Sequence, residues 1–181
     1  MIDVAASAAV PELADALKKR VVTLEALFDE IATTRMQGVP VKNQALKVQA
    51  VGFAPVPQQP DMLQGVLITP WFMNLVRLPL RNETASDRVL AERQKATRQF
   101  GNTDFEFIGS FEVRIGAFEV CSLYSPMFKF ADHAAAMATA QEVLNQLHRP
   151  TPRPASTAPA VPSRRGFLLG RSAGASPGTR A

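Results

Sequence analysis

The sequence predicts an α+β fold, with a mostly antiparallel sheet of about five strands flanked by an N-terminal and a C-terminal helix. Apolar residues recur at steps of three and four over residues 12–36 and again over residues 132–147, which is typical of helices. Between them the apolar spacing changes to two, which is typical of strands. Because the strand-like segments follow one another instead of alternating with helices, neighbouring strands are expected to pair antiparallel.

The first helix is predicted over residues 12–36. Pro11 suits the first helical position, where its missing N–H would have no partner, and Gly38 and Pro40 mark the end. Arg20 belongs to the polar side, which we expect to face solvent. The apolar side consists of Leu13, Leu17, Val21, Leu24, Phe28 and Ile31.

A first strand is predicted over residues 46–50, where apolar and polar residues alternate. Residues 55–61 hold three prolines and are expected to form a loop. The most apolar part of the chain follows. It predicts two strands, 63–69 and 72–78, separated at Pro70.

The second half of the chain begins with a polar stretch that could form a short helix over residues 84–98. Alternating apolar residues then predict a strand over 105–108 and further strand structure over 111–123, with a turn at Gly116. The last helix is expected to begin at Asp132, whose side chain can cap it, and to run to about Leu147, where His148, Arg149 and Pro150 mark the end.

The net charge divides the chain into two parts. Residues 1–149 carry a net charge of −1, whereas residues 150–181 hold five arginines, no acid and a net charge of +5. We therefore expect residues 1–149 to form the α+β domain and residues 150–181 to be a Pro/Ala/Ser-rich linker and basic tail, with a short RRGFLLGR element at Arg164–Arg171. A neutral domain argues against a nucleic-acid partner.

Several other classes of protein are excluded by composition. No stretch approaches the roughly 20 apolar residues of a membrane helix, so no membrane insertion is expected. The N-terminus has Asp3 and no early Lys or Arg, which is unlike a secretory signal. One cysteine cannot build a disulfide framework or a multi-cysteine metal site. These features favour a cytoplasmic location.

No catalytic constellation is recognisable, and we expect neither an enzyme nor a bound cofactor. His133 and His148 lie at opposite ends of one predicted helix, too far apart to share a metal. No glycine-rich phosphate loop follows a strand, and the acids are scattered. Cys121 is expected to be a buried, inert thiol. The alternative is a redox role with Cys121 as carrier thiol.

Two segments are candidates for protein binding. The first contains Thr69, Pro70, Trp71, Phe72, Met73 and Asn74, and the second contains Ser125, Pro126 and Met127. Trp and Met are enriched at the centres of interfaces, so a partly exposed apolar patch is one interpretation. The other is a kinked core strand for the first segment and a packed strand-to-helix connection for the second.

Three motifs resemble those of the HybE-type nickel–iron hydrogenase assembly chaperones. They are the run from Gly65 to Leu75, the run Ser122–Met127 followed by Phe130-Ala131-Asp132, and the element Arg164–Arg171. They occur in the family's order, and the resemblance covers about residues 20–172.

The resemblance implies a non-catalytic accessory protein in hydrogenase maturation. Its expected partner is the precursor of the hydrogenase large subunit, small subunit or both, held before export by the twin-arginine route. Other maturation proteins, including a separate rubredoxin, are further expected partners, since one cysteine cannot itself ligate a rubredoxin iron. The tail is expected to make a second contact through Arg164, Arg165, Phe167, Leu168 and Arg171, either with the partner or folded back over the apolar patch of the domain. The alternative is a redox-protective or cofactor-related maturation factor acting through Cys121.

Overall fold

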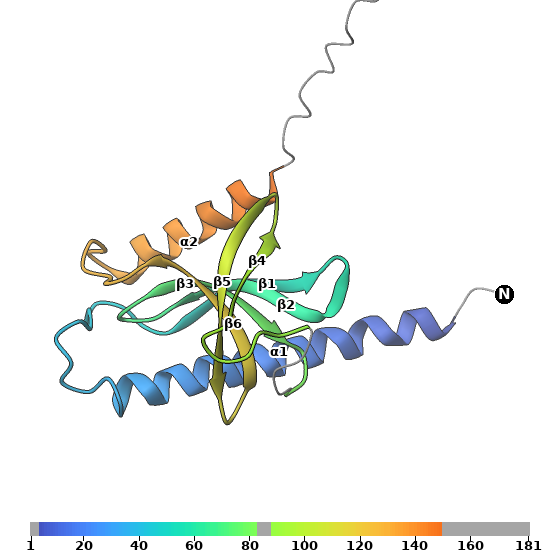
Figure 1. Ribbon diagram of the computed structural model, residues 1–181, viewed down its shortest axis with the longest axis horizontal. Coiled ribbons are helices and arrows are strands. Elements are labelled where there is room, and N and C mark those ends of the chain that lie inside the picture. Colours follow the sequence, from blue (N-terminus) through green and yellow to red (C-terminus); the bar gives the residue numbers. More distant parts are fainter. Residues whose placement is uncertain (1–3, 83–87, 150–181) are drawn as a thin grey trace, which may run out of the picture. The chain divides into compact units, whose positions relative to one another are not determined.

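The computed structural model describes residues 4–82 and 88–149 (Figure 1). The basic tail and residues 83–87 lie outside the described residues. Within the described part the chain forms two helices and six strands, α1 (Val4–Thr33), β1 (Gln49–Val56), β2 (Gln59–Ile68), β3 (Met73–Pro79), β4 (Lys95–Phe100), β5 (Thr103–Glu112), β6 (Gly116–Tyr124) and α2 (His133–His148).

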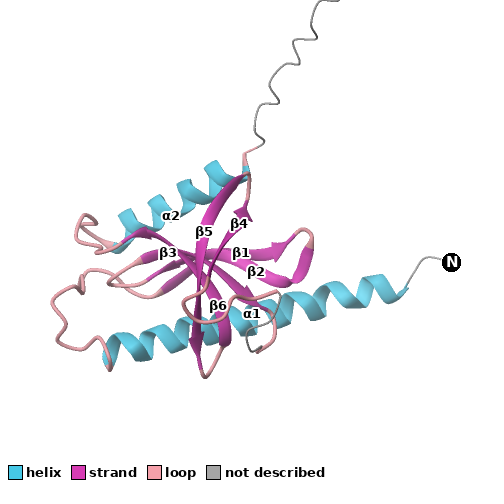
Figure 2. Cartoon of the chain, viewed as in Figure 1, coloured by secondary structure: helices cyan, strands magenta, loops and turns pink. Residues whose placement is uncertain are grey.

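All neighbouring strands pair antiparallel, in the order β1-β2-β3-β6-β5-β4. Figure 2 shows β4 and β5 crossing the direction of β1 and β2 steeply, so the sheet is strongly curled. The predicted α+β class is confirmed, with six strands in the described residues where about five were expected.

The two helices cover opposite faces of the sheet. Alternate side chains of a strand point to opposite sides of the sheet. In β3, Met73 and Leu75 pack into the apolar cluster that contains α2 residues. Val76 and Leu78 pack into the apolar cluster that contains α1 residues. Each face of the sheet therefore has its own apolar core.

Helix α1 begins earlier than predicted, at Val4 instead of residue 12. The alanine-rich stretch before Pro11 has high helix propensity, so the helix continues through the proline. The interpretation of Arg20 as solvent-exposed was wrong. Its side chain is buried and donates hydrogen bonds to the carbonyl of Pro79, at 2.7 Å, and to that of Ile115, so it ties α1 to the sheet.

The predicted loop at residues 55–61 was also wrong, because β1 and β2 extend into it. Pro55 lies in β1, an edge strand of the sheet, where a missing N–H is tolerated. Pro60 lies in β2 ahead of Met62, the first residue of that strand to pair with β3. Only Pro57 falls in the turn between the strands.

The possible helix over residues 84–98 is not formed in its described part. Residues Lys95–Phe100 form β4, and their exposure alternates with the period of two that an edge strand shows. The preceding turn is fixed by hydrogen bonds from the N–H of Arg93 to Gly109 and from the N–H of Gly109 to Gln94, both 2.8 Å long. Long-range pairing therefore overrides the weak local pattern.

The predictions for Gly116 and Asp132 are confirmed. Gly116 has a φ of +72°, which favours glycine, and it opens β6 after the turn from β5. The carboxylate of Asp132 accepts a hydrogen bond of 2.8 Å from the N–H of Ala135 and caps α2. No helix among the described residues has the length and apolar character needed to cross a membrane.

Candidate functional site

The structure brings the two predicted binding segments together at one end of the sheet. Met73, the first residue of β3, pairs with Tyr124, the last residue of β6. The residues before β3 and those after β6 are therefore neighbours, and the hydroxyl of Ser125 lies 3.4 Å from the carbonyl oxygen of Trp71, to which it donates. We call residues 69–74 and 125–130 the paired-motif site.

Thr69 fixes the turn that carries Trp71. Its hydroxyl oxygen accepts hydrogen bonds from the N–H of Trp71 at 3.3 Å and from the N–H of Phe72 at 3.0 Å. The N–H of Thr69 donates to the carbonyl of Phe72 at 2.8 Å. Because its side chain is buried, Thr69 positions the turn and is not a contact surface.

Asn43 joins both segments of the site and was missed by the sequence analysis. Its N–H donates to the carbonyl of Pro70 at 2.8 Å. Its side-chain amide donates to the carbonyls of Met127 at 3.1 Å and Phe130 at 2.8 Å. A single asparagine in a polar loop carries no sequence signal for this role, which depends on contacts made far along the chain.

The aromatic side chains of the first segment pack on α1. The rings of Phe28 and Phe72 meet edge to face, with centroids 5.7 Å apart, and those of Phe28 and Trp71 are 6.5 Å apart. Trp71 and Phe72 also form an edge-to-face pair at 5.6 Å. Both are half-buried, so each stabilises the α1 interface and keeps part of its surface accessible.

The predicted site residues differ in what they can present to a partner. Thr69, Pro70, Met73, Asn74 and Met127 are buried, Trp71 and Phe72 are half-buried, and Ser125 and Pro126 are exposed. The tail residues Arg164, Arg165, Phe167, Leu168 and Arg171 lie outside the described residues.

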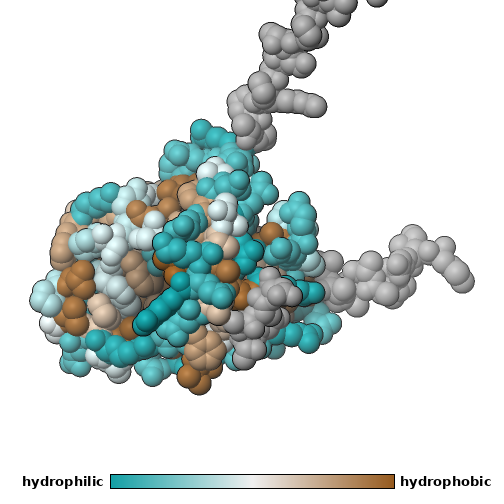
Figure 3. Space-filling view, viewed as in Figure 1, coloured by the Kyte–Doolittle hydropathy of each residue, from teal (hydrophilic) through white to brown (hydrophobic). Residues whose placement is uncertain are grey.

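Phe128 and Lys129 add to the exposed part of the paired-motif site. The Phe128 side chain is 60% exposed, which is unusual for so large an apolar group. The Lys129 ammonium lies 3.6 Å from the centroid of the Tyr124 ring, a cation–π geometry that places a positive charge beside the apolar surface. Figure 3 shows apolar surface at the left end of the molecule, where Figure 1 places both the loop after β6 and the loop between α1 and β1.

A pocket of about 330 Å³ lies beside the paired-motif site. It is bounded by the end of α1, the loop before β1 and Pro70. Leu46 and Val48 supply apolar lining, Lys42 and Lys47 supply positive charge, and Asp29 supplies one negative charge. The exposed aromatic surface thus continues into a concave, partly basic surface.

Cys121 lies in β6, half-buried against the α2-side core. Burial, and to a smaller extent the negative charge of Glu106, raises the pKa of this thiol. A raised pKa lowers the thiolate fraction at neutral pH, and the thiolate is the nucleophile. The environment of Cys121 therefore agrees with an inert thiol and speaks against a carrier thiol.

We expect iodoacetamide at pH 7 to label Cys121 in the folded chain at least about tenfold more slowly than in the chain unfolded in urea. Because the thiolate forms above the raised pKa, the native rate should increase as the pH is raised from 7 towards 9. Mass spectrometry of quenched samples measures both rates. Equal rates in the folded and unfolded chain at pH 7 would revive the redox alternative.

The histidines do not form a metal site with other described residues. The Nε2 of His133 lies 2.7 Å from the amide oxygen of Gln49. The Nδ1 of His133 accepts a hydrogen bond of 3.3 Å from the N–H of Lys47. These bonds join the start of α2 to β1 and the loop before it. Over residues 4–82 and 88–149, no group of three or more His, Cys, Asp or Glu side chains could hold an ion.

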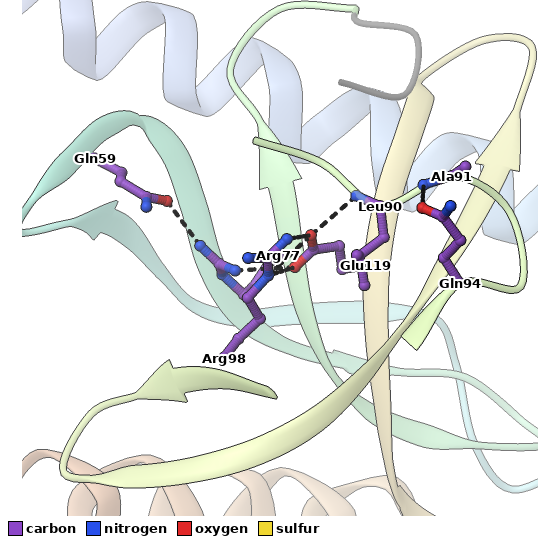
Figure 4. Close-up of polar contacts among 7 residues, drawn as sticks. All are labelled: Gln59, Arg77, Leu90, Ala91, Gln94, Arg98 and Glu119. Carbon is purple, nitrogen blue, oxygen red and sulfur yellow. Dashed lines mark hydrogen bonds and ion pairs between the residues drawn. The ribbon is translucent and has the colours of Figure 1, made fainter. Parts of the chain in front are cut away.

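A buried ion cluster, which the sequence analysis missed, lies on the α2 side of the sheet (Figure 4). The fully buried carboxylate of Glu119 accepts from Arg77 at 2.9 Å, from Arg98 at 2.9 Å and from the N–H of Leu90 at 3.1 Å. Burial lowers the pKa of Arg77, which Glu119 partly offsets. Single charged residues inside the apolar strands β3 and β6 were the available signal.

A family model described as NiFe-hydrogenase assembly, chaperone, HybE matches residues 19–170, which is most of the chain. The chain belongs to the HybE family. The resemblance predicted from the three motifs is confirmed, and the HybE family match extends into the predicted basic element at Arg164–Arg171.

Relatives and a solved structure agree with HybE family membership. Protein HoxT of Cupriavidus necator is 46% identical over 84% of this chain and 89% of its own length. Hydrogenase expression/formation protein HupJ of Bradyrhizobium diazoefficiens is 38% identical over 79% of this chain and 83% of its own. The solution structure of HybE from Escherichia coli, 22% identical, matches with a TM-score of 0.54 over 86% of this chain and 91% of that one, and so shares the fold. The chain is therefore an accessory protein of hydrogenase assembly.

Proposed function

We propose that this protein binds immature hydrogenase subunits before their export, through the exposed part of the paired-motif site. The observation that carries the proposal is that both family-typical segments meet at one end of the sheet and present Trp71, Phe72, Pro126 and Phe128 to solvent there. Aromatic side chains dominate binding energy at interfaces. A small patch of this kind supports an interaction that can be released when maturation is complete.

The client is the precursor of the large subunit, the small subunit or both, and a separate rubredoxin is a further partner of the same assembly process. The role is non-catalytic and cytoplasmic, which fits a protein that acts before export. Residues 1–149 supply the binding domain, and residues 150–181 supply the linker and tail. The tail makes the second contact, through Arg164, Arg165, Phe167, Leu168 and Arg171.

The test uses variants that keep the core intact. Phe128→Glu changes an exposed side chain of the paired-motif site, and we expect it to reduce capture of hydrogenase subunit precursors by about tenfold or more. Capture is measured by affinity purification of the full chain from hydrogenase-expressing cells blocked in export, with quantitative mass spectrometry. Deleting residues 150–181 should reduce capture further.

Val113→Glu is the matched control, because Val113 is an apolar side chain, 85% exposed, in the turn between β5 and β6. That turn forms the lower tip of the molecule in Figure 3, away from the paired-motif site. The control should capture precursors as the unchanged chain does. Equal capture by Phe128→Glu and Val113→Glu contradicts binding through the paired-motif site, and recovery of no hydrogenase subunit by any form contradicts the proposed function.

A further inference from the structure

A second pocket, distinct from the paired-motif site, lies on the α2 side of the sheet between its two edge strands. It has a volume of about 380 Å³ and is lined by residues 54–56 of β1 and residues 97–99 of β4. Since β1 and β4 are the first and last strands in the sheet order, the curl of the sheet brings both edges to one pocket. His148, at the end of α2, closes one side.

The pocket carries a surplus of positive charge. Arg77 and Arg98 line it, and no Asp or Glu is among its described lining residues. Glu119, which is not among the lining residues, is bonded to both guanidinium groups and neutralises one of the two charges (Figure 4). One positive charge remains for a ligand, which favours a ligand with a carboxylate.

Two residues that line the pocket each hold a buried polar atom with no hydrogen-bond partner among the described residues. These atoms are the Nε of Arg77, whose residue is 3% exposed, and the Oε1 of Gln64, whose residue is 7% exposed. Gln64 and Arg77 face each other across β2 and β3, so a donor and an acceptor that lack partners stand side by side. Buried polar groups are normally satisfied, so a donor and an acceptor without partners call for a water, an ion or a ligand group between them.

One chemical group satisfies both atoms. A peptide group offers a carbonyl oxygen to the Nε–H of Arg77 and an N–H to the Oε1 of Gln64. An extended peptide also suits the flanking strands, because edge strands present backbone donors and acceptors that are not used within the sheet. The shape and chemistry of the pocket thus favour a peptide over a free anion.

We propose that this pocket binds an extended acidic peptide segment of a partner protein. The peptide backbone meets Gln64 and Arg77, and a carboxylate of the segment meets Arg98. This inference rests on the proposed function, because the segment is taken to come from the client protein. It adds the chemistry of that segment and a binding surface other than the paired-motif site.

The test selects short random peptides from a display library on the full chain and on two variants. Ala54→Trp places a large side chain in the pocket beside Gln64, its pairing neighbour, and leaves the three residues of the ion cluster unchanged in sequence. Ala26→Trp is the matched control, an exposed alanine on α1, which covers the opposite face. We expect the unchanged chain and Ala26→Trp to enrich Asp and Glu, and Ala54→Trp not to do so.

The best-enriched peptide is then titrated into isotope-labelled full chain and followed by NMR. We expect the NMR chemical shifts of Gln64, Arg77 and Arg98 to change on binding. The affinity should fall about tenfold when the acidic residues of the peptide are replaced by their amides, and by a similar factor with Ala54→Trp. No acidic enrichment, or binding unaffected by Ala54→Trp, would overturn the proposal. Acetate causing the same shifts at equal concentration would also overturn it, because the pocket would then bind any carboxylate.

Failure here is distinguishable from failure of the proposed function. The peptide selection needs no hydrogenase subunit, and the capture experiment tests Phe128, which does not line this pocket. If peptide binding is absent but precursor capture is intact, only the proposal of peptide binding in this pocket is contradicted. If peptide binding is intact but no precursor is captured, only the proposal that the client is a hydrogenase subunit is contradicted.

Discussion

Replacing Glu119 by Gln is expected to lower the free energy of unfolding by about 3–5 kcal/mol. The carboxylate is fully buried and holds Arg77 and Arg98 in place. Without the negative charge of Glu119, the Arg77 guanidinium stays buried with no counter-ion. An uncompensated buried charge strongly destabilises the folded state. Urea denaturation at pH 7 measures the loss as a lower midpoint.

Glu106→Gln is the control, because Glu106 also pairs with a cation from a neighbouring strand but does so at the surface. Its bond to Lys95 is 2.8 Å long, and both side chains are more than half exposed. Exposed pairs contribute at most about 1 kcal/mol, so the control should change the midpoint little. Similar losses in the two variants would show that the buried cluster does not stabilise the fold in this way.

The ion cluster also shows how far the sequence could predict the structure. Arg77 stands between Val76 and Leu78, and Glu119 stands between Phe118 and Val120, so both were visible as charges inside apolar strands. Their mutual contact was not predictable, because it depends on β6 pairing with β3 across about forty residues of chain. Single buried charges can be found from local patterns, whereas their partners require the strand order.

The same distinction explains the errors in the elements. Helix α2 was predicted nearly at its true bounds because Asp132 and Pro150 are local signals that act within one turn. Strand β4 was missed because its pattern is polar and its structure depends on pairing with β5. Prolines predicted a loop where β1 and β2 run, since the sequence does not state that β1 is an edge strand.

For the candidate site, the segments were predictable but their arrangement was not. The two segments are distinctive in sequence, yet nothing local shows that Met73 pairs with Tyr124 or that Asn43 bonds to both segments. The sequence analysis left open whether Trp71 and Phe72 belong to the core or to a surface. They are half-buried against Phe28, so both interpretations describe part of the side chains.

Replacing Phe28 by Ala is expected to lower the free energy of unfolding by about 3–5 kcal/mol. Phe28 is 7% exposed and lies among Trp71, Phe72 and Phe118, with ring centroids 5.7–6.5 Å away. Its removal leaves a cavity under the aromatic surface and frees one side of Trp71. Because Trp71 is the only tryptophan of the chain, its fluorescence should shift to longer wavelength in the still-folded variant.

Phe128→Ala is the control for this effect, since Phe128 is an exposed phenylalanine of the same site and its loss should change stability by about 0.5 kcal/mol or less. The two variants distinguish a residue that positions Trp71 from a residue that contacts the precursor directly. If α1 holds Trp71 in its binding position, Phe28→Ala weakens precursor capture although Phe28 is buried, and Phe128→Ala weakens it without loss of stability. An unshifted Trp71 emission together with full capture by Phe28→Ala would mean that α1 does not position the paired-motif site.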